Sequence, residues 1–107
     1  MNNGMRDGIA EKAYFHYLKR VQNNIEPDEK QDWEDAEREQ NIEDKIKEEA
    51  YFHYLKYGDY PLLNWLMAKN EIYQRIQFLA FYLHEADINK SPTENWKEAE
   101  KLYLKEF

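Results

Sequence analysis

The sequence predicts an all-α fold, and three observations favour it. The 107 residues contain only three glycines and three prolines, so few breaks interrupt the chain. Two stretches without either residue, 28–57 and 62–86, are rich in good helix formers such as Glu, Lys, Ala and Gln. A pattern of Ile, Ala and Trp at helical spacing occurs three times. We expect four helices, at about Asp7–Gln22, Asp28–Tyr57, Pro61–Ala86 and Pro92–Glu106.

The threefold pattern defines an internal repeat. In each copy an isoleucine stands four residues before an alanine that is followed by an aromatic residue, and a tryptophan later stands three residues before a second alanine. Positions four apart share one face of a helix, so each copy predicts two helices joined by a turn. The copies span about 8–41, 45–72 and 75–104 of a single helical domain, 1–107. Because alanine lets a large ring lie close, we expect a core built from Ala13, Trp33, Ala36, Ala50, Trp65, Ala68, Ala80, Trp96 and Ala99.

The first helix contains the phrase EKAYFHYLK, which returns almost unchanged as EEAYFHYLK in the second. The helical period places Ala13, Tyr14, Tyr17 and Leu18 on its inward face. Pro27 suits the first position of the second helix, where proline loses no hydrogen bond. The second helix is weakest at Asn41, where a kink or break is expected if the helix is not continuous.

Local signals also set the two later turns. Gly58 suits the left-handed residue that ends the second helix, and Asp59 is the expected cap of the third, which begins at Pro61. Before the fourth helix, Ser91 is the expected cap, with Pro92 at the first position and a glutamate three residues after the cap.

The helix lengths predict the topology. The second and third helices form a long antiparallel hairpin around Gly58, with the shorter first and fourth helices folded back on them. One end becomes a four-helix cluster, and the other is a two-helix end that we expect to pack on something. If the helices break near Asn41 and Ile72, the alternative is a short solenoid of three stacked hairpins.

The net charge of −7 lies in one segment. Residues 26–49 hold twelve acidic and four basic residues, a net charge of −8. Without clustered Lys and Arg, direct nucleic-acid binding is not expected. The chain lacks cysteine, a signal-peptide pattern and any apolar run of about 20 residues, so we expect a cytoplasmic protein that does not enter membranes.

The repeat resembles a bacterial family of short helical-hairpin modules whose function is unassigned. The pattern I-x-x-x-A-Y, then a turn, then W-x-x-A-E carries the resemblance, which covers nearly the whole chain. Family members usually have one hairpin, often with Leu-Trp shortly after the Tyr; here that place reads HYL, and the first and third copies lack the turn glycine. The resemblance implies hairpins and brings no catalytic residues. The matches are Ile9, Ala13, Tyr14, Trp33, Ala36, Glu37, Ile46, Ala50, Tyr51, Gly58, Trp65, Ala68, Ile76, Ala80, Trp96, Ala99 and Glu100.

No residue pattern predicts catalysis, a metal or a cofactor. His16 and His53 are equivalent by repeat, whereas His84 is one position out of register. Glu49 and His53 are four apart and share a face, but the first copy has Lys12 in place of the glutamate. The metal-binding spacings His-Glu-x-x-His and Glu-x-x-His do not occur. We interpret the histidines as residues that support packing, and we expect no enzyme.

Phe15 and Phe52 are the main candidates for binding a partner. Each lies about 100° around the helix from the preceding tyrosine, in a row of charged residues. They are either the flank of a wide core or contacts for another chain. The sequence therefore favours a non-enzymatic protein–protein interaction or adaptor module, with a homodimer as one form of it, that uses Phe15, Phe52, Glu34, Asp35 and Glu48. The alternative is an acidic decoy that occupies the basic nucleic-acid-binding surface of another protein; a small-molecule enzyme is the weakest interpretation.

Overall fold

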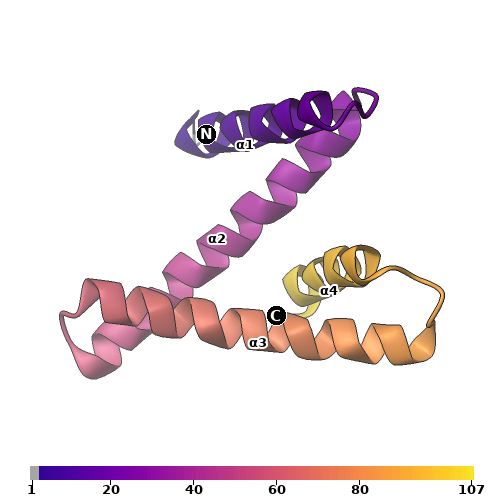
Figure 1. The fold of residues 1–107 in the computed structure, drawn as a ribbon. Coiled ribbons are helices and arrows are strands. Elements are labelled where there is room, and N and C mark those ends of the chain that lie inside the picture. Colours follow the sequence, from indigo (N-terminus) through magenta and orange to yellow (C-terminus); the bar gives the residue numbers. More distant parts are fainter. Residues whose placement is uncertain (1–2) are drawn as a thin grey trace. The chain divides into compact units, whose positions relative to one another are not determined.

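A computed structural model describes the backbone of residues 3–107 and the side chains from residue 8 onward. Within these residues the fold is all-α, as predicted, and contains no strand. The bounds of the third and fourth helices are those expected, the second begins one residue later, and the first begins four residues earlier. The helices are α1 (Asn3–Gln22), α2 (Glu29–Tyr57), α3 (Pro61–Ala86) and α4 (Pro92–Glu106) (Figure 1).

Helix α2 continues through Asn41 without a break. The breaks that the solenoid alternative requires, near Asn41 and Ile72, therefore do not occur in α2 or α3. The chain nevertheless divides into two compact units, residues 1–41 and 42–107, whose boundary lies inside α2. The first unit holds the first predicted repeat, and the second unit holds the other two.

In the first unit, α1 runs antiparallel to the first part of α2. Arg20 Nε donates to Asp32 Oδ1 at 2.6 Å, His16 Nε2 lies 2.7 Å from Glu39 Oε1, and Lys12 Nζ donates to Gln40 Oε1 at 3.0 Å. Residues earlier in α1 pair with residues later in α2, as in an antiparallel helical hairpin.

The inward face of α1 differs from the predicted one. Tyr14 and Tyr17 are 57% and 41% exposed, so the prediction that they face inward is wrong. The side chains of α1 that form polar contacts with α2 are instead Lys12, His16 and Arg20. The facing surface of α2 is polar and acidic, so cationic and hydrogen-bonding groups fit it better than tyrosine rings.

Two residues do not have the role predicted for them at the start of a helix. Asp28, not Pro27, precedes α2 directly, and its Oδ1 accepts from Gln31 N at 3.0 Å. Because this carboxylate satisfies a free N–H, the helix begins after it and Pro27 lies outside. Before α3 the cap residue is Tyr60, which makes no side-chain cap bond, so Asp59 is not the cap.

The other turn predictions are confirmed. Gly58 has a φ of 103°, a conformation that favours glycine. Ser91 is the cap residue of α4, and its side chain accepts a hydrogen bond from Glu94 N at 3.1 Å. Pro92 is the first residue of this helix.

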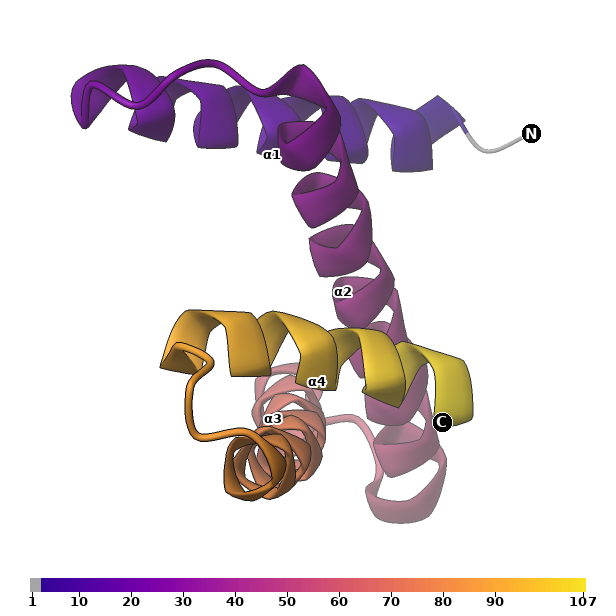
Figure 2. The same cartoon turned by 90° about the vertical axis from the view of Figure 1, so that its right-hand side faces the viewer.

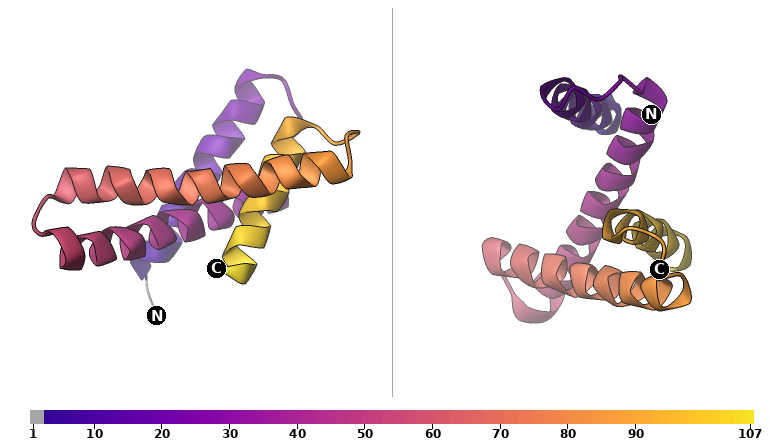
Figure 3. Two further views of the ribbon diagram at one scale, coloured as in Figure 1. Left: turned by 90° about the horizontal axis from the view of Figure 1, so that it is seen from below. Right: turned by 45° about the vertical axis from the view of Figure 1, so that its right-hand side comes forward.

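The second unit is a three-helix cluster. The second part of α2 and α3 lie side by side and antiparallel, and α4 crosses them (Figures 2 and 3). On α3 the core residues recur every four positions, which gives a single buried stripe. Lys45 Nζ on α2 donates to Phe107 O at 3.2 Å and so holds the end of α4. The buried core consists of Ile42, Ile46, Ala68, Ile72, Ile76, Ala99 and Tyr103.

Candidate functional site

The isoleucine and the second alanine of the repeat are buried in all three copies. The isoleucines Ile9, Ile46 and Ile76 are at most 5% exposed. The second alanines, Ala36, Ala68 and Ala99, are all 0% exposed. These small and branched side chains form the interior of each hairpin.

The remaining expected core residues lie closer to the surface. The first alanines, Ala13, Ala50 and Ala80, are half-buried, as are Trp65 and Trp96. Trp33 departs from the expected core position, because it is 37% exposed. Its indole Nε1–H donates to Glu37 Oε2 of the same helix at 3.2 Å. The Trp33 ring is therefore partly exposed and hydrogen-bonds within its own helix.

A buried polar residue precedes each tryptophan, and sequence reasoning missed it. Asp32, Asn64 and Asn95 are 4%, 3% and 2% exposed. Asn64 Nδ2 donates to Gly58 O at 3.0 Å, and Asn95 Nδ2 lies 3.4 Å from His84 Nδ1. Each contact joins the start of the second helix of a hairpin to the preceding helix or turn. The signal was present in the sequence as [DN]-W-x-x-A.

Asp32, which holds this position in the first copy, forms an ion pair with Arg20. The hydrogen bond to the Asp32 carboxylate, together with the negative charge of that carboxylate, raises the pKa of Arg20 above its ordinary value. The Asp32 side chain is 5% exposed and that of Arg20 is 23% exposed. The buried carboxylate is thus compensated, as a buried charge must be.

Two histidine–glutamate pairs link helices at equivalent positions. His16 pairs with Glu39 at 2.7 Å in the first unit, and His53 pairs with Glu71 at 3.1 Å in the second. Both glutamates stand six residues after the repeat tryptophan. His53 also stacks on Tyr57, with the ring centroids 5.6 Å apart. These two histidines therefore bridge the helices of a hairpin.

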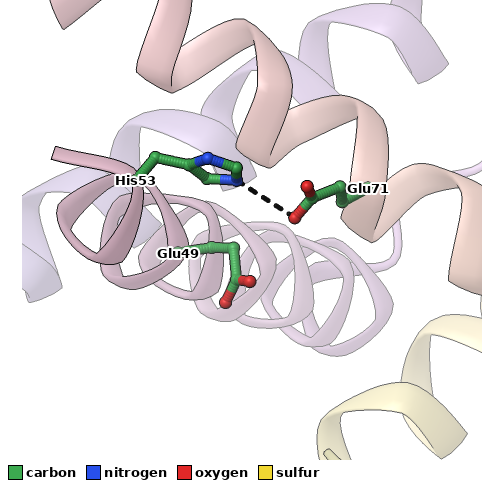
Figure 4. A group of neighbouring side chains, drawn as sticks. All are labelled: Glu49, His53 and Glu71. Atoms are coloured by element: carbon green, nitrogen blue, oxygen red, sulfur yellow. Dashed lines mark hydrogen bonds and ion pairs between the residues drawn. The ribbon is translucent and has the colours of Figure 1, made fainter. Parts of the chain in front are cut away.

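Glu49 joins the second of these pairs. Among the described residues, Glu49, His53 and Glu71 each offer a ligand atom, and these atoms lie within 4.8 Å of one another. Figure 4 shows Glu49 and His53 on α2 and Glu71 reaching across from α3. The first copy has Lys12 in place of Glu49, so this three-residue cluster belongs to the second copy.

Of the acidic residues predicted to bind a partner, Asp35 is not available. It is 4% exposed, and its Oδ1 accepts from Arg38 Nη2 at 2.9 Å and from Gln31 at 2.9 Å. The reason is local, because Arg38 lies one turn farther along the same helix and neutralises it. Glu34 and Glu48 are exposed. The predicted set of partner-binding residues therefore loses Asp35 as a contact.

Phe15 and Phe52 are 58% and 52% exposed, which is inconsistent with a position in a wide core. Their equivalent in the third copy, Tyr82, is 67% exposed. The aromatic residue just before each of them is also more than half exposed. Every copy thus presents a pair of aromatic side chains to solvent.

Exposed apolar side chains are densest where α2 turns into α3. We call residues 51–66 the hairpin tip. Nine of its large side chains are between 48% and 71% exposed: Tyr51, Phe52, Tyr54, Leu55, Tyr57, Tyr60, Leu62, Leu63 and Leu66. Its charged residues are Lys56 and Asp59, which cancel. The hairpin tip is therefore an apolar and electrically neutral part of an acidic chain.

A separate groove between α3 and α4 has a volume of about 600 Å³. A nucleophile activated by a base, or a pair of carboxylates, does not occur among the residues that line it. It is lined by Tyr73, Gln77, Ala80, Phe81, His84, Pro92, Asn95 and Trp96. This groove is aromatic in character and does not hold a recognisable catalytic set.

Over the described residues, no helix combines the length and the apolar character that crossing a bilayer requires. The predicted cytoplasmic location stays a prediction.

Comparison with models of protein families, with curated proteins and with solved structures found no match for this chain.

Proposed function

We propose that this protein is a non-enzymatic helical module that binds another protein chain through its hairpin tip, and that a second copy of itself is one such partner. The observation that carries the proposal is the group of nine large side chains, each about half exposed or more, within sixteen residues. Soluble proteins seldom leave so dense an apolar surface uncovered unless it binds something.

The size of this surface fits a stable interface. Half of a large aromatic or aliphatic side chain corresponds to roughly 100 Å², so nine of them offer on the order of 900 Å². A standard protein–protein interface takes about 800 Å² from each partner. The hairpin tip thus reaches the standard size when nearly all of these side chains take part in the contact.

Electrostatics favour this region for self-association. Two copies that each carry a net charge of −7 repel one another at low salt. The hairpin tip has no net charge, so contact through it brings the fewest like charges together. Residues 26–49, which carry the excess of acidic charge, lie outside the tip and therefore outside the proposed contact.

The test compares two variants that add the same charge. Phe52→Asp places a carboxylate within the tip, and Ile88→Asp places one at a residue that is 74% exposed and outside the tip. We expect the wild type to dimerise in a concentration-dependent way by sedimentation equilibrium. A central aromatic contact is typically worth at least ~2 kcal/mol, so Phe52→Asp should weaken association about 30-fold or more.

The control decides between the tip and charge in general. Ile88→Asp should dimerise nearly as well as the wild type, and both variants should keep their helical circular dichroism. A wild type that stays monomeric at millimolar concentration would exclude self-association. Equal weakening by the two variants would exclude the hairpin tip as the interface.

A further inference from the structure

We infer that Glu49, His53 and Glu71 form a binding site for a divalent transition-metal ion, with Zn²⁺ as the ion that fits best. The inference does not depend on self-association through the hairpin tip. It starts from the three ligand atoms, one imidazole nitrogen and two carboxylate oxygens, that lie within 4.8 Å of one another.

The spacing of these atoms suits one shared ion. Zinc binds imidazole nitrogen and carboxylate oxygen at about 2.0–2.2 Å, so two ligands in a tetrahedral site lie roughly 3.4 Å apart. His53 Nε2 and Glu71 Oε2 are already 3.1 Å apart. An ion between them would need only small movements of the Glu49 and Glu71 side chains.

The ligands are held by the fold to different degrees. The His53 side chain is 9% exposed and stacks on Tyr57, which fixes the plane of the imidazole. Its Nδ1 is buried without a hydrogen-bond partner, and Nε2 is the nitrogen that faces Glu71 (Figure 4). The Glu71 side chain is 39% exposed, and Glu49 is half-buried, so both carboxylates can adjust. A rigid imidazole with two adjustable carboxylates is a workable ligand set.

There is also room for the ion. A cavity of about 220 Å³ opens beside the cluster, and Glu49, Phe52, His53, Lys56, Tyr57 and Glu71 line it. A water molecule takes about 30 Å³, so the ion and the water of a fourth coordination position fit. Lys56 Nζ lies 5.2 Å from the centre of the Tyr57 ring. With one lysine beside two carboxylates, the cavity lining keeps a net negative charge when His53 is neutral.

The choice of ion follows from the ligands. Mg²⁺ and Ca²⁺ prefer sites made entirely of oxygen, whereas an imidazole with carboxylates suits Zn²⁺ and its neighbours in the first transition row. The first repeat shows what the third ligand adds. There, His16 and Glu39 form the same pair with Lys12 in the place of Glu49, and an ammonium group repels a cation.

The experiment titrates the full-length protein with Zn²⁺ by isothermal calorimetry, with Mg²⁺ as the control ion. We expect one saturable Zn²⁺ site per chain and no comparable Mg²⁺ binding. Glu49→Lys gives the second copy the residue that the first copy carries, so the fold should be kept, and Zn²⁺ affinity should fall at least ~10-fold. His53→Ala should have a similar effect on affinity.

The matched control is His16→Ala, which removes the equivalent imidazole of the first unit. It should leave both the stoichiometry and the affinity unchanged. The inference is overturned if the wild type shows no saturable binding at millimolar Zn²⁺, if Glu49→Lys binds as well as the wild type, or if His16→Ala abolishes binding. Circular dichroism of each variant shows whether a loss of Zn²⁺ binding reflects unfolding. Glu49 is the deciding position, because it is less buried than His53 and its substitution disturbs the fold less.

Discussion

Ile72 lies at the centre of the second unit, and its truncation measures how far that unit depends on its core. The side chain is 1% exposed and lies between Ala68 and Ile76 on the buried stripe of α3. Ile72→Ala removes three carbon atoms, at about 0.8 kcal/mol each for transfer alone. A cavity term adds to this, because a packed core closes only partly, so we expect about 3–4 kcal/mol of destabilisation.

That loss is a large part of the stability of a small domain. For about 60–100 residues, 1 kcal/mol corresponds to a change of roughly 4–8 °C in melting temperature, so the expected fall is at least ~12 °C. Urea unfolding followed by circular dichroism gives the free energy directly. Ile88→Ala removes the same atoms from a side chain that is 74% exposed, and it should cost less than about 0.5 kcal/mol. Equal shifts in the two variants would refute the buried position of Ile72.

Two further variants test local interactions. Arg20→Ala leaves the buried carboxylate of Asp32 without its cation. It should therefore lower the free energy of unfolding in urea more than Asp32→Asn, which installs the amide found in the other two copies. The opposite order would contradict the ion pair. Ser91→Ala removes the oxygen that accepts the Glu94 N–H and should cost about 1 kcal/mol in thermal unfolding, whereas Ser91→Asn should cost little. An unchanged melting temperature in Ser91→Ala would show that this cap is dispensable.

Helix positions could be predicted where a strong local signal stood alone. Gly58, Ser91 and Pro92 have one physical role each, and all three adopt it. The prediction failed where two residues compete for one role. Asp28 follows Pro27 and can satisfy a free N–H, so the helix begins after the aspartate. The local sequence indicates that either residue could mark the start of the helix, but it does not show which of the two does.

The candidate sites needed the three-dimensional arrangement. Glu71 lies 18 residues from His53, and only the register of the hairpin brings them together. The same offset from the repeat tryptophan in the first copy, where Glu39 meets His16, was the available signal. The burial of Asp35 could not be predicted from the sequence either, because a row of acidic residues is typical of a solvated helix face. Only the structure shows that Arg38 pairs with this aspartate.

The histidine–glutamate pairs have a consequence for how the chain can vary. In the third copy, the positions of His53 and Glu71 are occupied by Leu83 and Leu102. The same backbone unit therefore accepts either two polar residues or two apolar ones. A mixed combination would leave an imidazole or a carboxylate opposite a hydrocarbon, so we expect both residues to change together when related chains diverge. In an alignment of related chains, such paired changes would identify each copy of the hairpin even where the aromatic residues around it have been replaced.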